Sequence, residues 1–348
     1  MHIFYSPHHL LHDTADLIVE GNPFLIEEVP QRVEIIRQAV EQAGLGVAET
    51  PDDHGIDPIL AVHHADYVHY LQRAYDEYVR VFPKEQAVVP GTFAPRSARH
   101  KSRHIYGEAG IYAFGVGAPI LQGTWKAAYW SAQCALAAAE RILAGERAAY
   151  ALCRPPGHHA AANLCGGFCY LNNAAIAARY LHQRGKAHGD NSATVAVLDI
   201  DYHHGNGTQE IFYADPNVLF CSLHAHPDDD YPYYWGDSDE NGTGLAIGAN
   251  RNWPLPQGVD DPGYLAALAE ALEVVRAFKP AFLVVSLGLD TFCGDPVGGF
   301  NLTRAGLAAV GQQVAGLELP SLIVQEGGYL LEALGENAVA FLQAFRGA

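Results

Sequence analysis

Apolar residues recur along the chain in two alternating patterns, one typical of buried strands and the other of helices. Short β-branched runs such as 194–197 and 281–286 are apolar at nearly every position, as expected for strands covered on both faces. Between such runs lie longer segments, for example 30–43 and 261–278, with apolar residues every three or four positions. This repeated alternation predicts an α/β fold with a mainly parallel β-sheet and helices on both faces.

The same pattern gives the order of the predicted elements. We expect strands at 2–5, 149–153, 194–199, 218–223, 281–287 and 321–325, and helices at 30–43, 65–79, 125–144, 172–184, 207–213, 261–278, 304–315 and 330–345. An irregular stretch rich in aromatic and acidic residues is expected between 223 and 261. The sequence has no internal repeat, low-complexity tract or linker, so residues 1–348 are predicted to form a single domain.

One long segment, 82–118, fits neither pattern. It contains Pro83, Pro90 and Pro95, several glycines and a cluster of basic and histidine side chains between 96 and 104. Ordered loops of this length are uncommon in compact domains and usually have a function or form an interface. We therefore expect this segment to be functional or interface-forming.

Polar residues cluster directly after five of the predicted strands. These segments are 154–159, 199–204, 222–224, 287–290 and 326–329. In open parallel sheets, ligands bind outside the carboxyl ends of the strands. We predict that the five segments form one rim and that this rim is the functional site.

The segment 198–207, LDIDYHHGNG, has the most distinctive polar pattern. Side chains two positions apart on a strand point the same way, so Asp199, Asp201 and His203 begin in register. A carboxylate and an imidazole suit zinc, and we expect Asp201 and His203 to be its ligands. Helix capping would need only one Asp. The nucleophile loop of aspartyl-phosphate phosphatases also fits less well, because it lies near the start of its domain and small residues follow it.

Asp290 follows another predicted strand and is expected to be the third ligand. A lone Asp before Thr291 would ordinarily cap a turn or helix. At the same sheet edge as Asp201 and His203, it completes a three-ligand zinc site with an open position for water. Zinc in such a site lowers the pKa of its bound water to about 7 and polarises a carbonyl oxygen.

Three more side chains are candidates for the chemistry itself. His158 and His159 follow Pro-Pro-Gly in a turn and offer two imidazoles to one pocket. We expect His159 to be the general base with Asn206 as its partner, and His158 to be oriented or kept charged by Asp199. Tyr329, in Gly-Gly-Tyr, could donate to a developing oxyanion, although this tripeptide is also an ordinary turn.

Gly167, Phe168 and Tyr231 offer bare backbone and aromatic rings near these motifs. They would suit a narrow tunnel that grips an extended aliphatic chain. Aromatic residues in loops are as commonly simple packing residues, so both interpretations stay open on the residues alone.

The amino-acid composition argues against some classes of binding partner. Lys and Arg total 21 against 39 acids, a net charge of −18, which argues against nucleic acid and mildly favours cationic ligands. There is no apolar run of the ~20 residues that a membrane span needs, and no secretory signal at the N-terminus, so we predict no membrane partner. The six scattered cysteines are typical of reduced thiols, and we predict a cytoplasmic protein.

Together these motifs resemble the histone deacetylase superfamily, and within it the bacterial acetylpolyamine amidohydrolases. The matching segments are RPPGHHA (154–160), GGFCYLNNAAIAA (166–178), LDIDYHHGNGTQEIFY (198–213), SLH (222–224), SLGLDTF (286–292) and EGGY (326–329). Weaker similarity extends over essentially the whole chain. The resemblance implies the arginase–deacetylase fold and a zinc hydrolase that cleaves acetyl amides.

The resemblance also implies roles for individual residues. Zinc would be held by Asp201, His203 and Asp290, with the tandem histidines as acid–base pair and Tyr329 polarising the substrate carbonyl. Phe168 falls at a tunnel-wall position of the family, with Tyr231 facing it. A potassium ion is implied beneath the zinc, with oxygen ligands from the following residues: Asp199, Asp201, His203, Ser222 and Leu223.

The substrate is the least determined part of the prediction. The polyamine enzymes resemble this chain in their long loop near 82–118, which implies a homodimer or homotetramer with the loop at the interface and the active-site rim. Glu108 is the candidate contact for a distal amine, yet no acid occurs from 109 to 139. The candidates are a deacetylase of acetylpolyamines or similar small cationic amides, the same chemistry on acetyl-lysine peptides or other acyl amides, and a catalytically silent acyl-binding protein.

Overall fold

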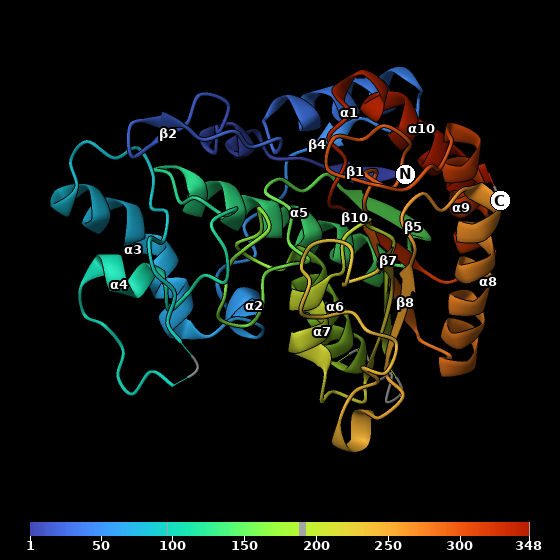
Figure 1. The fold of residues 1–348 in the computed structure, drawn as a ribbon. Coiled ribbons are helices and arrows are strands. Elements are labelled where there is room, and N and C mark those ends of the chain that lie inside the picture. Colours follow the sequence, from blue (N-terminus) through green and yellow to red (C-terminus); the bar gives the residue numbers. More distant parts are fainter. Residues whose placement is uncertain (96, 188–192, 348) are drawn as a thin grey trace.

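The core of the protein is an eight-stranded parallel sheet, seen in a computed structural model that describes residues 1–95, 97–187 and 193–347 (Figure 1). The strand order is β4-β1-β5-β10-β9-β6-β7-β8, and every neighbouring pair is parallel. The strands are β1 (His2–Phe4), β4 (Ala48–Glu49), β5 (Ala148–Ala151), β6 (Val195–Asp199), β7 (Val218–Ala225), β8 (Asn250–Leu255), β9 (Phe282–Leu287) and β10 (Ser321–Gln325). The predicted mainly parallel α/β sheet is confirmed.

Helices cover both faces of this sheet because its central strands are apolar on both sides. In β6, Val195 and Val197 join one buried cluster, while Ala196 and Leu198 join the other. One face is covered by α1 (Gln31–Gln42), α8 (Asp261–Phe278), α9 (Arg304–Ala315) and α10 (Leu331–Gly347). The opposite face is covered by α5 (Thr124–Leu143) and α6 (Asn173–Ala187), with α2 (Asp57–Leu60), α3 (Ala65–Val81) and α7 (Asn206–Phe212) around them.

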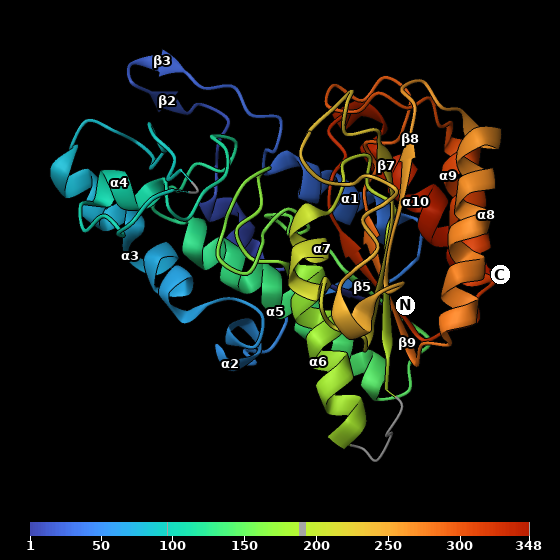
Figure 2. The same ribbon diagram turned by 60° about the horizontal axis from the view of Figure 1, so that its bottom comes forward.

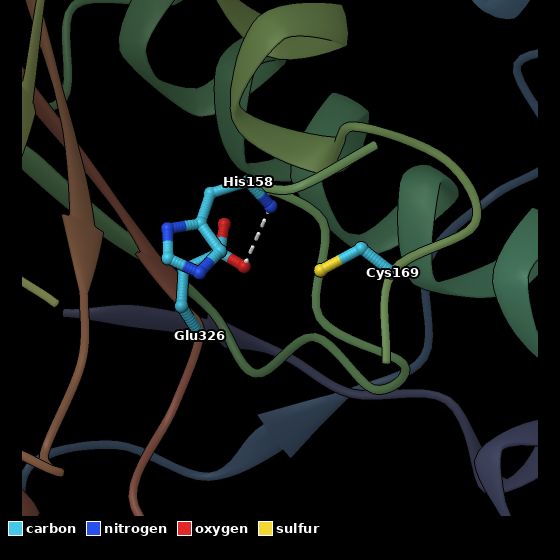
Figure 3. Close-up of side chains that lie close together, drawn as sticks. All are labelled: His158, Cys169 and Glu326. Carbon is cyan, nitrogen blue, oxygen red and sulfur yellow. Dashed lines mark hydrogen bonds between the residues drawn. The ribbon is translucent and has the colours of Figure 1, made fainter. Parts of the chain in front are cut away.

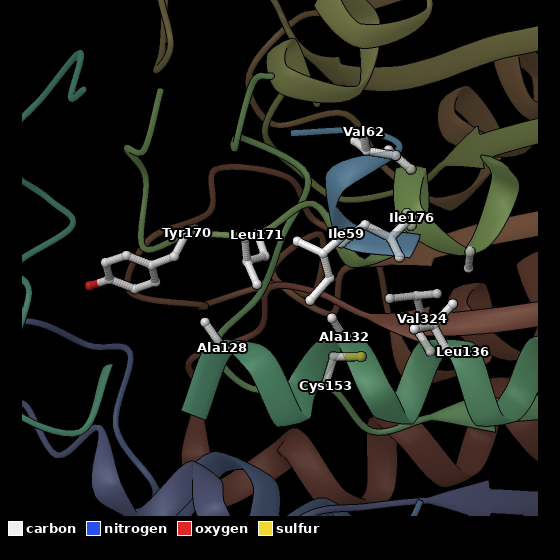
Figure 4. Close-up of a cluster of buried hydrophobic side chains, with 14 of the residues drawn as sticks. Ile59, Val62, Ala128, Ala132, Leu136, Cys153, Tyr170, Leu171, Ile176 and Val324 are labelled. Atoms are coloured by element: carbon white, nitrogen blue, oxygen red, sulfur yellow. The ribbon is translucent and has the colours of Figure 1, made fainter. Parts of the chain in front are cut away.

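The Ala-rich α5 is central to the second face. Nearly all of its middle turns are buried, and its small side chains let the neighbouring elements approach closely. Figure 4 shows Ala128, Ala132 and Leu136 of α5 below Ile59 and Ile176, which come from α2 and α6. This packing fixes the segment between β5 and α6, which contains the tandem histidines.

The predicted elements are confirmed within a few residues, and the structure adds helices and strands that the pattern did not indicate. The largest addition is β8, in a stretch expected to be irregular. Its sequence, NRNWPL, has no β-branched residue, and its Pro254 is tolerated because β8 is an edge strand. The other added strands and α-helices are the small pair β2 (Ile18–Val19) and β3 (Asn22–Pro23), the two-residue edge strand β4, the short helix α2, and α4 (Ile105–Ala109), which lies inside the segment expected to be an irregular loop.

The segment 82–118 lies on the side of the molecule away from α8 and α9. It contains α4 and lies near α3 and near the small antiparallel pair β2 (Ile18–Val19) and β3 (Asn22–Pro23), as both views show (Figures 1 and 2). Arg96, part of its basic cluster, lies outside the described residues. None of the helices in the described part of the chain combines the length and the hydropathy of a membrane-spanning segment.

Candidate active site

The five strands whose ends carry polar segments are neighbours in the sheet, in the order β5-β10-β9-β6-β7. Asp199 closes β6 and lies in register with Ser222 of β7 on one side and Ser286 of β9 on the other. All five strands run parallel, so the segments that follow them meet at one edge. The structure thus brings the predicted rim together.

At the centre of this rim, Asp201, His203 and Asp290 form a compact group of metal-type ligands. One ligand atom from each lies within 4.8 Å of the others, and all three residues are buried. His203 Nδ1 is 3.2 Å from Asp201 Oδ1 and 3.3 Å from Asp290 Oδ2. Within the part of the chain that the structure describes, the buried Asp290 Oδ2 has no hydrogen-bond partner, as expected for a carboxylate oxygen that binds a cation. The donor set fits zinc.

The other carboxylate atoms of this group are held by backbone N–H groups. Gly327 N donates to Asp201 Oδ2 at 2.8 Å, and Tyr202 N donates to Asp290 Oδ1 at 3.0 Å. Glycine is needed at position 327, because a Cβ there would lie 2.0 Å from Asp290 Oδ2 and 2.5 Å from Asp201 Oδ2. The Gly-Gly of the last motif therefore lets the chain pass directly beneath both carboxylates.

The adjacent histidines sit in opposite electrostatic surroundings. His158 Nδ1 is 3.1 Å from Asp199 Oδ2; burial alone would lower the pKa of His158, but the carboxylates of Asp201 and Asp199 outweigh it and raise it to about 10. His159 Nδ1 is 2.7 Å from the amide oxygen of Asn206. Burial and the imidazoles of His158 and His203 hold the pKa of His159 well below its ordinary value. One imidazole is kept charged and the other neutral, as a base requires.

Tyr329 reaches the same place from the loop after β10. Asp295 Oδ2 accepts hydrogen bonds from the backbone N–H groups of Tyr329 (2.6 Å) and Leu330 (3.0 Å), and Asp295 itself is buried. The guanidinium of Arg32 lies 4.4 Å from the centre of the Tyr329 ring. Burial raises the pKa of the phenol, so its proton stays available for donation, while Arg32 acts in the opposite direction.

Arg32 belongs to a buried ion cluster behind Tyr329. Its Nε and Nη2 donate to the backbone carbonyls of Gly328 (2.6 Å) and Glu326 (2.7 Å), and its Nη1 donates to Glu28 Oε1. The same Glu28 oxygen accepts from Arg154 Nε at 2.8 Å. One carboxylate therefore holds two arginines that support the loop of Tyr329 and the Pro-Pro-Gly turn.

A cavity of about 470 Å³ opens above these groups. His159, His203 and Tyr329 lie at its base, and its walls are mainly aromatic. The wall residues are Phe114, Gly115, Val116, Gly117, Gly167, Phe168, Asp230, Tyr231, Pro232, Tyr233, Tyr234, Trp235 and Val297. Phe168 faces Tyr329 at 5.7 Å, and Tyr231 faces His159 at 5.0 Å between ring centres. A Cβ at position 167 would lie 2.3 Å from His159 Cδ2. Glycine at this position therefore allows the backbone of the cavity wall to lie directly against the His159 ring.

The family is decided by comparison with known proteins. Residues 26–345 match the family described as the histone deacetylase domain. The chain belongs to the histone deacetylase family. Membership makes it an amide hydrolase of the deacetylase type, and it agrees with the α/β deacetylase fold predicted from the motifs.

Several relatives within the histone deacetylase family are similar over their full length. Acetylpolyamine amidohydrolase 1 of Pseudomonas aeruginosa is 42% identical, with 99% of this chain and 98% of the relative covered. The acetylpolyamine amidohydrolase of Mycoplana ramosa is 36% identical, with 100% of both chains covered. A crystal structure of an acetylpolyamine aminohydrolase from Burkholderia pseudomallei superposes with a TM-score of 0.92 at 40% identity, covering 99% and 98% of the two chains.

A second buried group near this deacetylase centre, His158, Cys169 and Glu326, also has metal-type atoms close together. Figure 3 shows that the Glu326 carboxylate faces the backbone N–H of His158, and the same oxygen accepts from Gly157 N at 2.6 Å. Burial raises the pKa of the Cys169 thiol well above its ordinary value. A protonated thiol and a carboxylate engaged with backbone make a poorer site than the Asp-His-Asp group.

Of the predicted deacetylase residues, Glu108 alone is not brought to this site. Its carboxylate pairs with Arg73, and it is not among the residues that line the cavity of this chain. Conversely, sequence reasoning gave no role to Asp295, Glu28, Arg32, Phe114 or Trp235. The sequence shows Asp295 five residues after Asp290, and the acid Glu28 shortly before α1. Only the fold shows that these two carboxylates contact Tyr329 N and Arg32.

Proposed function

We propose that the protein is a zinc-dependent deacetylase of acetylated amines, with acetylpolyamines or similar small cationic acetyl amides as substrates. The observation that carries this proposal is the geometry of one cavity. A buried Asp-His-Asp group lies at the base, beside a neutral imidazole and a protonated phenol, and six of the wall residues are aromatic. Amide hydrolysis needs these groups together: a Lewis acid, a base and an oxyanion donor.

The proposed ligands for zinc are Asp201, His203 and Asp290. When bound, zinc would polarise the acetyl carbonyl and make water more acidic. Burial lowers the pKa of His203, but Asp201 and Asp290 outweigh it and raise the pKa to about 10, so metal and proton compete for this imidazole. We also propose a structural potassium ion with oxygen ligands from Asp199, Asp201, His203, Ser222 and Leu223, where Asp199 lies beside Ser222 in the sheet register.

The residues of the chain divide the proton chemistry. His159 donates its Nδ1 proton to Asn206 Oδ1, which leaves Nε2 with the free lone pair that removes a proton from water. His158, paired with Asp199, stays protonated and stabilises negative charge as the tetrahedral intermediate forms. The Tyr329 hydroxyl donates to the developing oxyanion. The proton that His159 takes up from water is then delivered to the leaving amine.

Three features support a small cationic substrate. Similar proteins are named acetylpolyamine amidohydrolases, the cavity is lined by rings that suit a slender chain, and the protein has a net charge of −18. The alternative within the same chemistry is an acetyl-lysine peptide or another acyl amide, which would also place a thin aliphatic chain between Phe168 and Tyr231. A silent acyl-binding protein would have no use for the protonated phenol and neutral imidazole beside the metal ligands.

We also propose that the chain forms a homodimer or homotetramer through 82–118. We further propose that it works in the cytoplasm. The exposed Phe93 supports the interface, and the six free cysteines support a reducing compartment. Sedimentation at micromolar concentration tests the assembly, and a monomer would contradict it.

The activity is tested with a panel of acetylated substrates. The protein is assayed with N-acetylputrescine, an acetyl-lysine peptide and a neutral N-alkylacetamide, before and after a chelator and after added zinc. We expect turnover to require zinc and kcat/KM to be highest for N-acetylputrescine. Preference for the peptide would overturn the polyamine assignment, and turnover that survives complete metal removal would overturn the zinc assignment.

A further inference from the structure

We infer that Asp230, together with the aromatic rings of Tyr231, Phe114 and Trp235, forms the subsite that receives the distal ammonium group of the substrate. This inference rests on the proposed function, because it assumes a cationic acetylated amine. This subsite is the part of the cavity that would distinguish such a substrate from a neutral amide of the same length.

Charge singles out Asp230. Among the described residues that line the cavity, it is the one Asp or Glu, and no Lys or Arg lines the cavity beside it. The carboxylates of Asp201 and Asp290 belong to the Asp-His-Asp group and do not line the cavity wall. A cation that enters the cavity therefore meets one uncompensated wall carboxylate.

The carboxylate of Asp230 is held in place before any ligand arrives. Its Oδ2 accepts a hydrogen bond from the Tyr202 hydroxyl at 2.6 Å, and its Oδ1 accepts one from Tyr231 N at 2.7 Å. Tyr202 is fully buried and packs against Phe300 at 4.7 Å between ring centres. Each carboxylate oxygen has two acceptor sites, so one remains on each oxygen for an ammonium donor. A fixed acceptor loses little conformational entropy on binding.

The aromatic rings that line the same cavity as Asp230 add a second kind of attraction. Tyr231 and Phe114 are stacked with ring centres 6.2 Å apart and 19° between planes, and Trp235 meets Phe114 edge-on at 5.8 Å. Aromatic faces attract a cation within about 6 Å of their centres. A carboxylate next to several rings thus matches an alkylammonium group in both charge and shape.

The other acidic candidates fit less well. Glu108 is neutralised by Arg73 and does not line the cavity. Asp228 is 90% exposed and also lies outside the cavity wall, so water screens its charge. Asp228 nevertheless stands two residues from Asp230 and has the same formal charge, which makes it a matched control.

The test compares Asp230→Asn and Asp228→Asn on two substrates, N-acetylputrescine and the neutral N-pentylacetamide. Asn keeps the size of Asp and can still accept from Tyr231 N. In Asp230→Asn we expect KM for N-acetylputrescine to rise about two- to fivefold, the upper part of the range for losing one partly exposed charge contact. We expect kcat to change by less than about twofold and both constants for the neutral amide to stay unchanged. Asp228→Asn should match the wild type on both substrates.

Other outcomes separate this inference from the function on which it rests. If the wild type prefers N-acetylputrescine and Asp230→Asn keeps that preference, or if the variant loses activity equally on both substrates, the ammonium subsite is wrong and the proposed function stands. If the wild type itself treats the two substrates alike, the cationic substrate is wrong. Should Asp230→Asn fail to fold, Asp230→Ser replaces it. Asp230→Glu, which restores the charge, should recover most of the preference.

Discussion

The base and the mouth of the active-site cavity are built on different principles. At the base, Asp201 and Asp290 are fully buried, sit at strand ends and are bound by backbone N–H groups. At the mouth, Tyr233 and Tyr234 are 55% and 81% exposed and belong to a long segment between β7 and β8. The sheet and its backbone N–H groups fix the positions of the side chains at the base. At the mouth, single exposed side chains can be replaced without disturbing the sheet. We infer that the base sets the reaction and the mouth sets the substrate.

The largest effect is expected from removing a ligand at the base. Asp290→Ala deletes the carboxylate whose Oδ2 has no hydrogen-bond partner in the described chain. Turnover should fall at least as far as on loss of a general base, about 10²–10⁴-fold. Zinc content per chain, measured after gel filtration, should fall with it. Full zinc content in this variant would remove Asp290 from the ligand set, and Asp228→Ala serves as the control carboxylate.

The next effect concerns the phenol that Asp295 holds. Tyr329→Phe should lower kcat by about 10²–10³ with KM little changed, the cost of one lost oxyanion donor, while zinc stays bound. Asp295→Ala frees the backbone of Tyr329 and should lower kcat by about 10- to 100-fold through misplacement of the ring. Asp295→Asn, which keeps one acceptor oxygen, should recover part of that loss. If Asp295→Ala changes KM and leaves kcat intact, Asp295 does not position Tyr329.

The buried His12 gives the fold a dependence on pH. Burial and Arg154 lower its pKa to about 3 from 6.5, and its Nδ1 lies 2.9 Å from Thr124 Oγ1. The unfolded chain binds a proton at His12 below about pH 6.5, whereas the folded chain does not until about pH 3. The free energy of unfolding contributed by this residue is therefore complete above pH 6.5 and falls as the pH drops toward 3.

This pH effect is measured by difference. The thermal midpoint of the wild type is compared with that of His12→Gln at several values from pH 7 to pH 4. Because Gln does not titrate, the variant should lose less stability than the wild type over this range. Equal slopes for the two proteins would show that His12 is protonated in the folded state.

The smallest effect is expected at the outer edge of the mouth. Tyr234→Ala removes a ring that is mostly exposed, so a cation gains at most about 0.5–1 kcal/mol from it. KM for a cationic substrate should rise by about two- to fivefold, and kcat should not change. A loss of kcat in Tyr234→Ala would show that the outer mouth takes part in the reaction. The base and the mouth would then not have separate roles.

The sequence predicts the base much better than the mouth, and the reason is physical. Asp199, Asp201 and His203 are delivered by one strand and its following turn, and parallel strands must end at the same edge, so local pattern and topology suffice. The mouth combines 114–117 with 230–235, and such pairings between distant loops leave no periodic signal. The same is true of Glu28 and Arg154, whose hydrogen bond joins residues 126 positions apart. Strand β8 was missed because an edge strand needs neither alternation nor β-branched residues.

The division between base and mouth is tested most directly by measuring kcat and KM for N-acetylputrescine and N-pentylacetamide in zinc-loaded wild type, Tyr329→Phe and Asp230→Asn. We predict that Tyr329→Phe lowers kcat for both substrates by the same factor, about 10²–10³. We also predict that Asp230→Asn raises KM for the cationic substrate alone. Unchanged kcat in Tyr329→Phe on both substrates, with zinc bound, would contradict the role of the base in the reaction.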